Sequence, residues 1–494
     1  MNNERNKCLD NAGNIHYLVK AIKAGGQGIV YRTRDASKAV KLVIENDKEV
    51  TDEKRIIDYQ KSFFRLRLLP VNKEVNITFP KTLLTKRAGY VMEFLSDMVS
   101  VDSLLIYEKK AEDIKDEEIP GWLKEWDIVS AKYIVAYNKT GGLRRRLLVL
   151  YKIASQLALL HGAGLVYCDI SANNIFISGE EDRCNAWLID ADNLEFEGET
   201  NLLRTYGFAA PELVLRKSNC TMSSDCHAFA VLAYRILTME LHPFFGRKVF
   251  YEDWANVKTK EKPADLALEG RYPWVRDEDD DSNSSEGGFS PELLYDKEIA
   301  NLFQKTFGKG RLDPSKRPPI FYWPPAFARA ADSTIQCPGC KMSYRYDYHD
   351  DDGKEQCPHC GSSKPLMLVM EAYAWDGAMG ERQWLFAREI EAETSVQVPA
   401  RVFSLAPLTK SDIPVMEIEI QGKMLYFKKA DDAEIDFSVA VTGIEQGQFR
   451  KLLSQVRFQT DSESILSEEI RFFIFAESGN CSRMVKCRIG RGQK

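Results

Sequence analysis

Two polar side chains that could do chemistry lie five residues apart in Val166–Ile177, namely Asp169 and Asn174. They occupy a predicted polar turn that enters an apolar, β-branched strand. The alternative interpretation is purely structural: the Asp169 side chain hydrogen-bonds its own backbone in a turn, as Asp often does. An Asp and an Asn at this spacing are common, so the choice depends on what lies on either side.

A Gly-rich turn and a lysine precede this pair. Ala24–Val30 separates two predicted strands, and its glycines would let the backbone turn N–H groups toward a triphosphate, although many Gly clusters are ordinary hairpin turns. Lys41 follows in a strand of otherwise apolar residues, so its ammonium must meet an anion or reach water. The predicted phosphate-binding residues of the turn are Gly25, Gly26, Gln27, Gly28 and Val30.

Further motifs occur in a fixed order around these residues, and together they resemble the protein kinase catalytic domain in its bacterial, eukaryotic-like branch. The resemblance covers Tyr17 to Phe327. Within it, an amphipathic helix over Leu143 to His161 is predicted from its apolar spacing and leads to the loop of Asp169. The other matching motifs are Asp190-Ala-Asp192, Ala210-Pro-Glu212, Asp225 before an apolar helix, and Arg317, which would pair with Glu212.

The resemblance implies a catalytic role for four residues. Lys41 would contact the α and β phosphates of ATP, and Asp169 would orient the attacking hydroxyl. Asn174 and Asp190 would hold Mg²⁺. Asp192 stands where kinases carry glycine, and it either joins the metal shell or caps a turn.

The resemblance also implies a partner for Lys41 and a site for adenine. Glu53 is the expected carboxylate partner, with Glu49 in reserve, although a solvated helical Glu is the alternative. The hinge that grips adenine would be formed by Met92, Glu93 and Leu95.

Two departures from the family pattern affect regulation and rate. Cys168 replaces the arginine that binds a phosphorylated activation loop in many kinases, so activity is expected not to depend on such phosphorylation. Ser171 replaces a basic residue that steadies the γ-phosphate, so turnover could be slow. A Ser/Thr acceptor is expected from the lineage alone. The hydroxyl residues of the short activation segment are Thr200, Thr205 and Tyr206.

Four cysteines downstream form two Cys-x-x-Cys pairs separated by sixteen residues. Each pair presents two sulfurs to one ion, and four thiolates leave no open position, so the pattern predicts a structural Zn²⁺. The segment between the pairs is acidic, which argues against nucleic-acid binding there. The predicted ligands are Cys337, Cys340, Cys357 and Cys360.

Composition and the remaining sequence complete the prediction. The chain has 494 residues and a formal net charge of −6, which gives no general attraction to nucleic acid or anionic lipid. No signal sequence or membrane span is evident, and the cysteine usage favours a reducing compartment, so a cytoplasmic protein is expected. Short β-branched and aromatic runs after Pro365 predict an all-β sandwich or barrel with an interaction role.

The predicted fold class is α+β: a bilobal protein kinase fold, then a zinc ribbon and a sandwich-like all-β domain. The expected function is a protein kinase using ATP and Mg²⁺ on a protein substrate; the alternatives are a nucleotide-sensing pseudokinase and a nucleic-acid-binding regulator. The domain order is similar to kinases found beside metal-dependent protein phosphatases and von Willebrand A-type proteins, which implies such partners. The predicted domains are residues 1–95 (N-lobe), 96–330 (C-lobe), 331–364 (ribbon) and 365–494 (β-rich domain).

Overall fold

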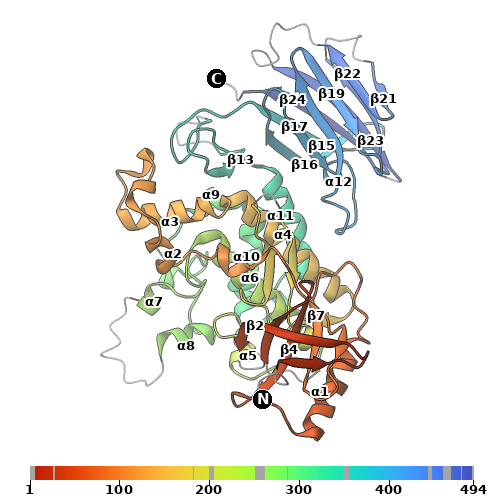
Figure 1. Ribbon diagram of the computed structural model, residues 1–494. Coiled ribbons are helices and arrows are strands. Elements are labelled where there is room, and N and C mark those ends of the chain that lie inside the picture. Colours follow the sequence, from red (N-terminus) through yellow and green to blue (C-terminus); the bar gives the residue numbers. More distant parts are fainter. Residues whose placement is uncertain are drawn as a thin grey trace.

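Three parts follow one another along the molecule in the computed structural model (Figure 1). A small N-terminal sheet lies at one end, the helical part occupies the middle, and two C-terminal sheets lie at the other end. The structure describes residues 6–25, 28–181, 183–199, 205–250, 262–285, 287–348, 355–442, 448–459, 469–479 and 481–491.

The N-terminal sheet is antiparallel, with the strand order β1-β2-β3-β4-β7-β6 and β5 paired to β4. Lys41 lies on the central strand β4, opposite Val30 of β3 and Tyr90 of β7. Because the backbone at Lys41 is paired with a strand on each side, the point on the sheet from which its side chain projects is fixed. The strands are β1 (Lys7–Leu9), β2 (Ile15–Gly25), β3 (Gly28–Thr33), β4 (Lys38–Glu45), β5 (Lys48–Glu49), β6 (Thr82–Leu83) and β7 (Gly89–Glu93).

One helix, α1 (Glu53–Leu66), packs on this sheet. Asp52 caps its N-terminus, because its carboxylate accepts a hydrogen bond from the backbone N–H of Arg55 at 2.9 Å. Its buried side chains are Ile56, Phe63 and Leu66, which are all apolar. The ring of Phe63 meets the ring of Tyr90 edge to face, with centroids 4.8 Å apart, so helix and sheet share one apolar contact beside Lys41.

The helical part is built around α4 (Gly142–Gly162) and α6 (Met222–Thr238), whose described side chains are mostly buried. The predicted helix over Leu143 to His161 is thus confirmed. Arg146 of α4 is fully buried and donates to five oxygens, four of them backbone carbonyls, which satisfies its guanidinium inside the lobe. The other helices are α2 (Glu108–Glu112), α3 (Ile128–Lys139), α5 (Pro211–Val214), α7 (Arg247–Phe250), α8 (Pro263–Leu268), α9 (Pro291–Leu294), α10 (Lys297–Phe307) and α11 (Trp323–Asp332).

Short strands flank the loops that contain the predicted catalytic residues of the helical part. β10 (Ile175–Ser178) pairs with β11 (Ala186–Leu188) and with β8 (Met98–Ser100), and β9 (Leu165–Val166) pairs with β12 (Glu195–Phe196). The loop of Asp169 therefore runs from β9 to β10, and Asp190 is the second residue after β11. The loop of Asp169 joins β9 to β10 and the loop of Asp190 joins β11 to β12, and because β9 pairs with β12 and β10 with β11, the ends of the two loops lie side by side.

The C-terminal region after Pro365 is a β-rich sandwich with one short helix among the described residues, which agrees with the predicted β-rich domain except for that helix. A six-stranded sheet has the order β16-β15-β24-β23-β20-β21, and a four-stranded sheet has the order β17-β18-β19-β22. Phe427 of β19 packs edge to face on Phe472 of β23, with ring centroids 5.1 Å apart, which joins the two sheets. The elements are β15 (Met367–Trp375), β16 (Met379–Glu389), β17 (Ser395–Pro399), α12 (Ala400–Phe403), β18 (Pro414–Gln421), β19 (Met424–Lys429), β20 (Asp436–Val441), β21 (Arg450–Leu452), β22 (Gln455–Gln459), β23 (Ile470–Ser478) and β24 (Cys481–Gly490).

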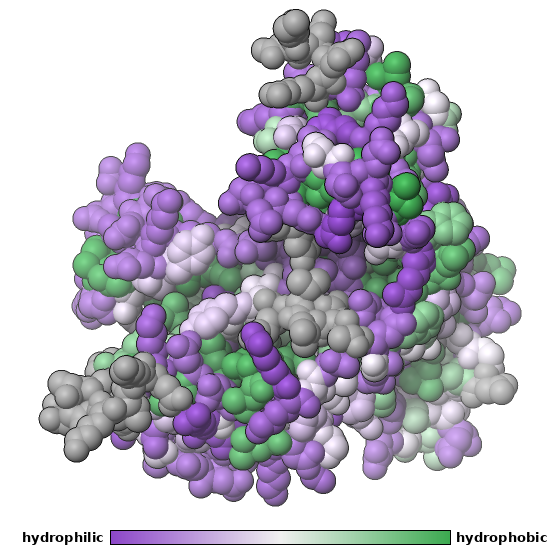
Figure 2. Space-filling view, turned by 90° about the horizontal axis from the view of Figure 1, so that it is seen from below, coloured by the Kyte–Doolittle hydropathy of each residue, from purple (hydrophilic) through white to green (hydrophobic). Residues whose placement is uncertain are grey.

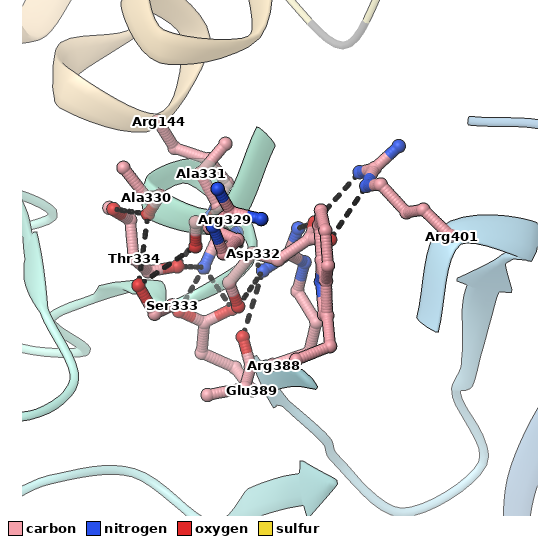
Figure 3. A network of polar contacts seen from close by, with 12 residues as sticks. Arg144, Arg329, Ala330, Ala331, Asp332, Ser333, Thr334, Arg388, Glu389 and Arg401 are labelled. Atoms are coloured by element: carbon pink, nitrogen blue, oxygen red, sulfur yellow. Dashed lines mark hydrogen bonds and ion pairs between the residues drawn. The ribbon is translucent and has the colours of Figure 1, made fainter. Parts of the chain in front are cut away.

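A buried carboxylate fastens this sandwich to the helical part. Asp332, the last residue of α11, is fully buried and accepts from Arg401 through both oxygens at 2.7 Å (Figure 3). Arg388 donates to it at 3.1 Å, and the indole N–H of Trp384 at 2.9 Å. All three donors belong to the sandwich, so these contacts hold the sandwich against the end of α11.

None of the helices described in the structure combines the length and the apolar character that crossing a membrane requires.

The face shown in Figure 2 is mostly hydrophilic, and its hydrophobic residues form small separate patches.

Candidate functional site

Lys41 lies at the centre of a polar cluster between the N-terminal sheet and the helical part. Its side chain is 5 % exposed, and its ammonium lies 2.9 Å from Asp190 Oδ1 and 2.7 Å from Asp192 Oδ2. Burial alone would lower the pKa of Lys41, but attraction to Asp192 and Asp190 outweighs it and raises the pKa above its ordinary value. Lys41 is therefore a charged ammonium held by two carboxylates.

The predicted pairing of Lys41 with Glu53 is wrong in this structure. Glu53 is exposed in the first turn of α1, where it lies as an acidic residue at a helix N-terminus. The reserve candidate, Glu49, instead accepts from Arg87 at 2.6 Å. The physical reason is that the buried face of α1 is apolar, so this helix brings no carboxylate to Lys41.

Asp192 differs from both roles considered for it, because it contacts the lysine. Its Oδ2 accepts from Lys41, and its Oδ1 accepts from the hydroxyl of Tyr90 at 2.9 Å. Tyr90 is fully buried, and burial together with the nearby carboxylates raises the pKa of its phenol well above the ordinary value. Tyr90 thus stays a neutral donor that fixes the orientation of Asp192.

The predicted catalytic loop brings Asp169 and Asn174 into direct contact. The amide nitrogen of Asn174 donates to Asp169 Oδ2 at 2.7 Å and to the Asp169 carbonyl at 3.1 Å. The hydroxyl of Thr205 donates to the other oxygen, Asp169 Oδ1, at 2.5 Å. The aliphatic hydroxyl of Thr205 is therefore hydrogen-bonded to the Asp169 carboxylate, the group that would orient an acceptor hydroxyl.

Two residues brace the backbone of this loop. Asp225, 2 % exposed, accepts from the N–H groups of Tyr167 and Cys168 at 2.7 and 3.0 Å, which supports the positive φ of 66° at Cys168. The hydroxyl of Tyr167 donates to the carbonyls of Asn174, at 3.0 Å, and of Ile189. Tyr167 thereby joins the loop of Asp169 to the strand that precedes Asp190.

The predicted ion pair between Arg317 and Glu212 is confirmed. It is bidentate, with N···O distances of 2.6 and 2.8 Å, and the Arg317 side chain is fully buried. This ion pair joins the end of the predicted activation segment to the segment that precedes α11. It thereby fixes the position of that end of the activation segment.

The residues present fit a magnesium ion. Asp190 and Asn174 offer carboxylate and amide oxygens, which are the hard ligands that Mg²⁺ prefers. Asp190 follows β11 and adopts a left-handed conformation, with φ of 60°, which turns its carboxylate toward Lys41. Asn174 is bound to Asp169 through its nitrogen, so its oxygen is the atom suited to a metal.

The Gly-rich turn lies partly outside the described residues, since Gly26 and Gln27 are not among them. Gly25 and Gly28 pair across β2 and β3. A Cβ on Gly28 would lie 2.7 Å from the carbonyl oxygen of Leu42, so this glycine lets β3 approach β4 closely. Gly28 therefore has a packing reason in addition to the predicted phosphate role.

The predicted hinge follows β7. Met92 is 9 % exposed, and the N–H of Phe94 donates to the carbonyl of Ser37 at 2.9 Å. Glu93 pairs with Lys81 at 3.0 Å, and Leu95 is half-buried. These contacts fix the backbone at the position proposed for adenine.

The four predicted cysteines converge on one point. Their sulfur atoms lie within 4.8 Å of one another, and the Cys337–Cys360 and Cys340–Cys357 pairs are 3.6 Å apart. Tetrahedral zinc with Zn–S bonds of about 2.3 Å gives sulfur separations of about 3.8 Å, so the donor set fits. The first pair, Cys337 and Cys340, lies in the turn that joins β13 (Thr334–Gln336) to β14 (Ser343–Arg345), and the second pair follows this hairpin.

His359, between two of these cysteines, packs among aromatic rings. Its ring centroid is 6.0 Å from that of Trp122 and 6.1 Å from that of Phe289. These contacts anchor the ribbon on the helical part.

Comparison with known proteins agrees with this geometry. Residues 130–320 match the protein kinase domain. This match covers less than half of the chain; it includes Asp169, Asn174 and Asp190, whereas Lys41 lies outside it. A serine/threonine-protein kinase of Caenorhabditis elegans, kin-29, is 29% identical over 163 residues, which is 29% of this chain and 19% of that relative. The chain thus covers less than a fifth of the relative's length, and the kinase domain is followed here by the four-cysteine cluster and the β sandwich.

Sequence reasoning missed three polar contacts of the site. Tyr90 and Tyr167 were not singled out for a positioning role, and Asp192 was not considered as a partner of Lys41. The apolar inward positions of α1 were the available signal, because a helix without a buried acid cannot provide the expected carboxylate.

Proposed function

We propose that this protein is a kinase that transfers the γ-phosphate of ATP to a protein hydroxyl, with serine or threonine as acceptor. The observation that carries the proposal is the contact of Lys41, on the N-terminal sheet, with Asp190, in the helical part, at 2.9 Å. Phosphoryl transfer depends mainly on positioning and charge stabilisation, and these two groups are its ammonium and its metal ligand.

Each residue has a distinct task in this proposal. Lys41 binds phosphate oxygens, while Asp190 and Asn174 hold Mg²⁺, which offsets the negative charge of the phosphates. Asp169 orients the acceptor hydroxyl, and its contact with Thr205 at 2.5 Å supports this task because Thr205 has the same functional group as the acceptor.

Turnover is expected to be independent of phosphorylation in the activation segment. Cys168 offers no charge for a phosphate, and the Thr205 hydroxyl is bonded to Asp169. Tyr206 donates to Asp265 at 2.9 Å, and Thr200 lies outside the described residues. Treatment with a phosphatase should leave the rate of transfer from ATP unchanged; a loss of more than tenfold would contradict this expectation.

The test of the function is transfer from γ-labelled ATP with Mg²⁺ to the protein itself or to coexpressed proteins, followed by phosphopeptide mapping. Asp169→Asn is expected to reduce the rate by about 10²–10⁴-fold, because general-base removal has that effect. Asp376→Asn, an identical change at an exposed turn of the sandwich, serves as the matched control.

Three results would count against the proposal. Nucleotide binding without any transfer would favour a pseudokinase, and transfer that survives Asp169→Asn would assign the activity to a contaminant. Binding of nucleic acid at low salt would instead favour a regulator acting through the ribbon.

A further inference from the structure

The helix that usually supplies a carboxylate to the catalytic lysine has none to supply here. The described helix α1 contains two acidic residues, Glu53 and Asp58, and both are exposed. Asp58 lies near Lys61, with an N···O distance of 3.7 Å. In protein kinases the pair of this lysine with a helix glutamate must be in place for transfer. A kinase with this α1 needs its carboxylate from elsewhere.

We propose that Asp192 supplies it: Asp192 is the positioning residue that holds Lys41 for phosphoryl transfer. Asp192 Oδ2 lies 2.7 Å from the ammonium, closer than Asp190 Oδ1 at 2.9 Å. This inference rests on the proposed function, because it assigns a partner to the lysine of that same site.

The surroundings of Asp192 hold its carboxylate in one orientation. A 3₁₀ turn, Ala191–Asn193, follows Asp190 and presents Asp192 on the same side as Asp190. The hydroxyl of Tyr90 binds the oxygen that Lys41 does not use. Phe63 of α1 packs on the ring of Tyr90, so α1 supports the pair through an apolar contact.

The two carboxylates that contact the Lys41 ammonium can have different roles. Asp190 is the acid suited to Mg²⁺, and metal binding would weaken its hold on Lys41 because the cation competes for the same oxygens. Both oxygens of Asp192 already accept from Lys41 and Tyr90, so this residue remains with the lysine. Lys41 then keeps one counter-charge while the metal is bound.

The proposal has a structural consequence for regulation. In kinases that use the helix glutamate, moving that helix breaks the ion pair. Here Lys41 and Asp192 lie on β4 and on the turn after β11, and α1 contributes no charged group to the pair. Displacement of α1 would therefore leave the ion pair intact.

The test compares Asp192→Asn with Asp58→Asn, the same chemical change on an exposed face of α1. With saturating Mg-ATP, Asp192→Asn is expected to lower the transfer rate at least tenfold, and Asp58→Asn to stay within twofold of the wild type. Glu53→Gln is expected to stay within twofold, while Tyr90→Phe, which removes only the hydroxyl bonded to Asp192, should give a smaller loss than Asp192→Asn.

A second readout reports on Lys41 directly. In the proposed function Lys41 contacts phosphate oxygens and not adenosine, so the ratio of the Kd values for adenosine and Mg-ATP reports whether its ammonium is held at the phosphates. Asp192→Asn should lower this ratio, whereas Asp58→Asn and Glu53→Gln should leave it unchanged. Unchanged zinc content and an unchanged urea midpoint would establish that the Asp192→Asn protein is folded.

The outcomes separate this inference from the proposed function. Wild-type rate and an unchanged ratio of the two Kd values in Asp192→Asn, or an equal loss in Glu53→Gln, would overturn the role of Asp192. Absence of transfer in the wild-type protein would overturn the proposed function, and the ratio of the two Kd values would still decide whether Asp192 holds Lys41 at the phosphates.

Discussion

Replacing Asp332 with asparagine is expected to destabilise the protein by about 3–5 kcal/mol. The change leaves Arg401, 6 % exposed, and Arg388 without the carboxylate that both contact. Asparagine retains the size of the side chain and one acceptor oxygen, so the effect is mainly that of removing a buried charge beside two guanidinium groups.

The matched control lies on the same interface. Asp412 pairs with Lys152, but the two side chains are 27 % and 25 % exposed, so Asp412→Asn should cost about 0–1 kcal/mol. Urea unfolding followed by tryptophan fluorescence measures both, and Trp384, bonded to Asp332, is a local reporter. With slopes of about 1–3 kcal/mol per M, the Asp332→Asn midpoint should fall by about 1 M or more. A shift no larger than that of Asp412→Asn would refute the reasoning.

The stability difference between the wild type and Asp332→Asn is also expected to depend on pH. Burial would raise the pKa of Asp332, but Arg401 and Arg388 hold it below its ordinary value of 3.8. The ionised carboxylate therefore stabilises the fold above pH 3.8, and this contribution is lost as the pH falls below that value toward the folded-state pKa. The stability difference between wild type and Asp332→Asn should be constant near neutral pH and shrink below about pH 4.

Two further predictions concern the metal centre and the helical part. Cys337→Ser should abolish stoichiometric zinc, measured with a chromophoric chelator after denaturation, because one of four thiolates is lost; Cys481→Ser, outside the cluster, should retain it, and zinc retained in Cys337→Ser would contradict the site. Arg317→Gln should lower the free energy of unfolding by about 3–5 kcal/mol, because it leaves the Glu212 carboxylate half-buried without its bidentate partner, and the urea midpoint measures this. Arg382→Gln, which removes an ion pair with 53 % and 35 % exposed side chains, should change it by about 0–1 kcal/mol, so equal effects of the two changes would refute the argument.

The sequence predicted those parts of the site that depend on local spacing. Asp169 and Asn174 lie within six residues, and the turn between two strands brings their side chains into direct contact. The pairs of cysteines likewise form local knuckles, so the zinc ligands could be named from spacing alone. Long-range pairs such as Arg317 with Glu212 were predicted through the resemblance to kinases.

The sequence also determined the order of the parts and the β-rich character of the C-terminal region, because periodicity and turn residues report on local backbone structure. It could not determine which acid reaches Lys41. Asp192 is 151 residues away from Lys41 in the chain, and its contact depends on how β4, β7 and the turn after β11 pack together. Only the tertiary structure decides which of several nearby carboxylates reaches a buried ammonium. The same holds for Asp332 at the end of α11, whose partners Arg388 and Arg401 come from β16 and α12 of the sandwich.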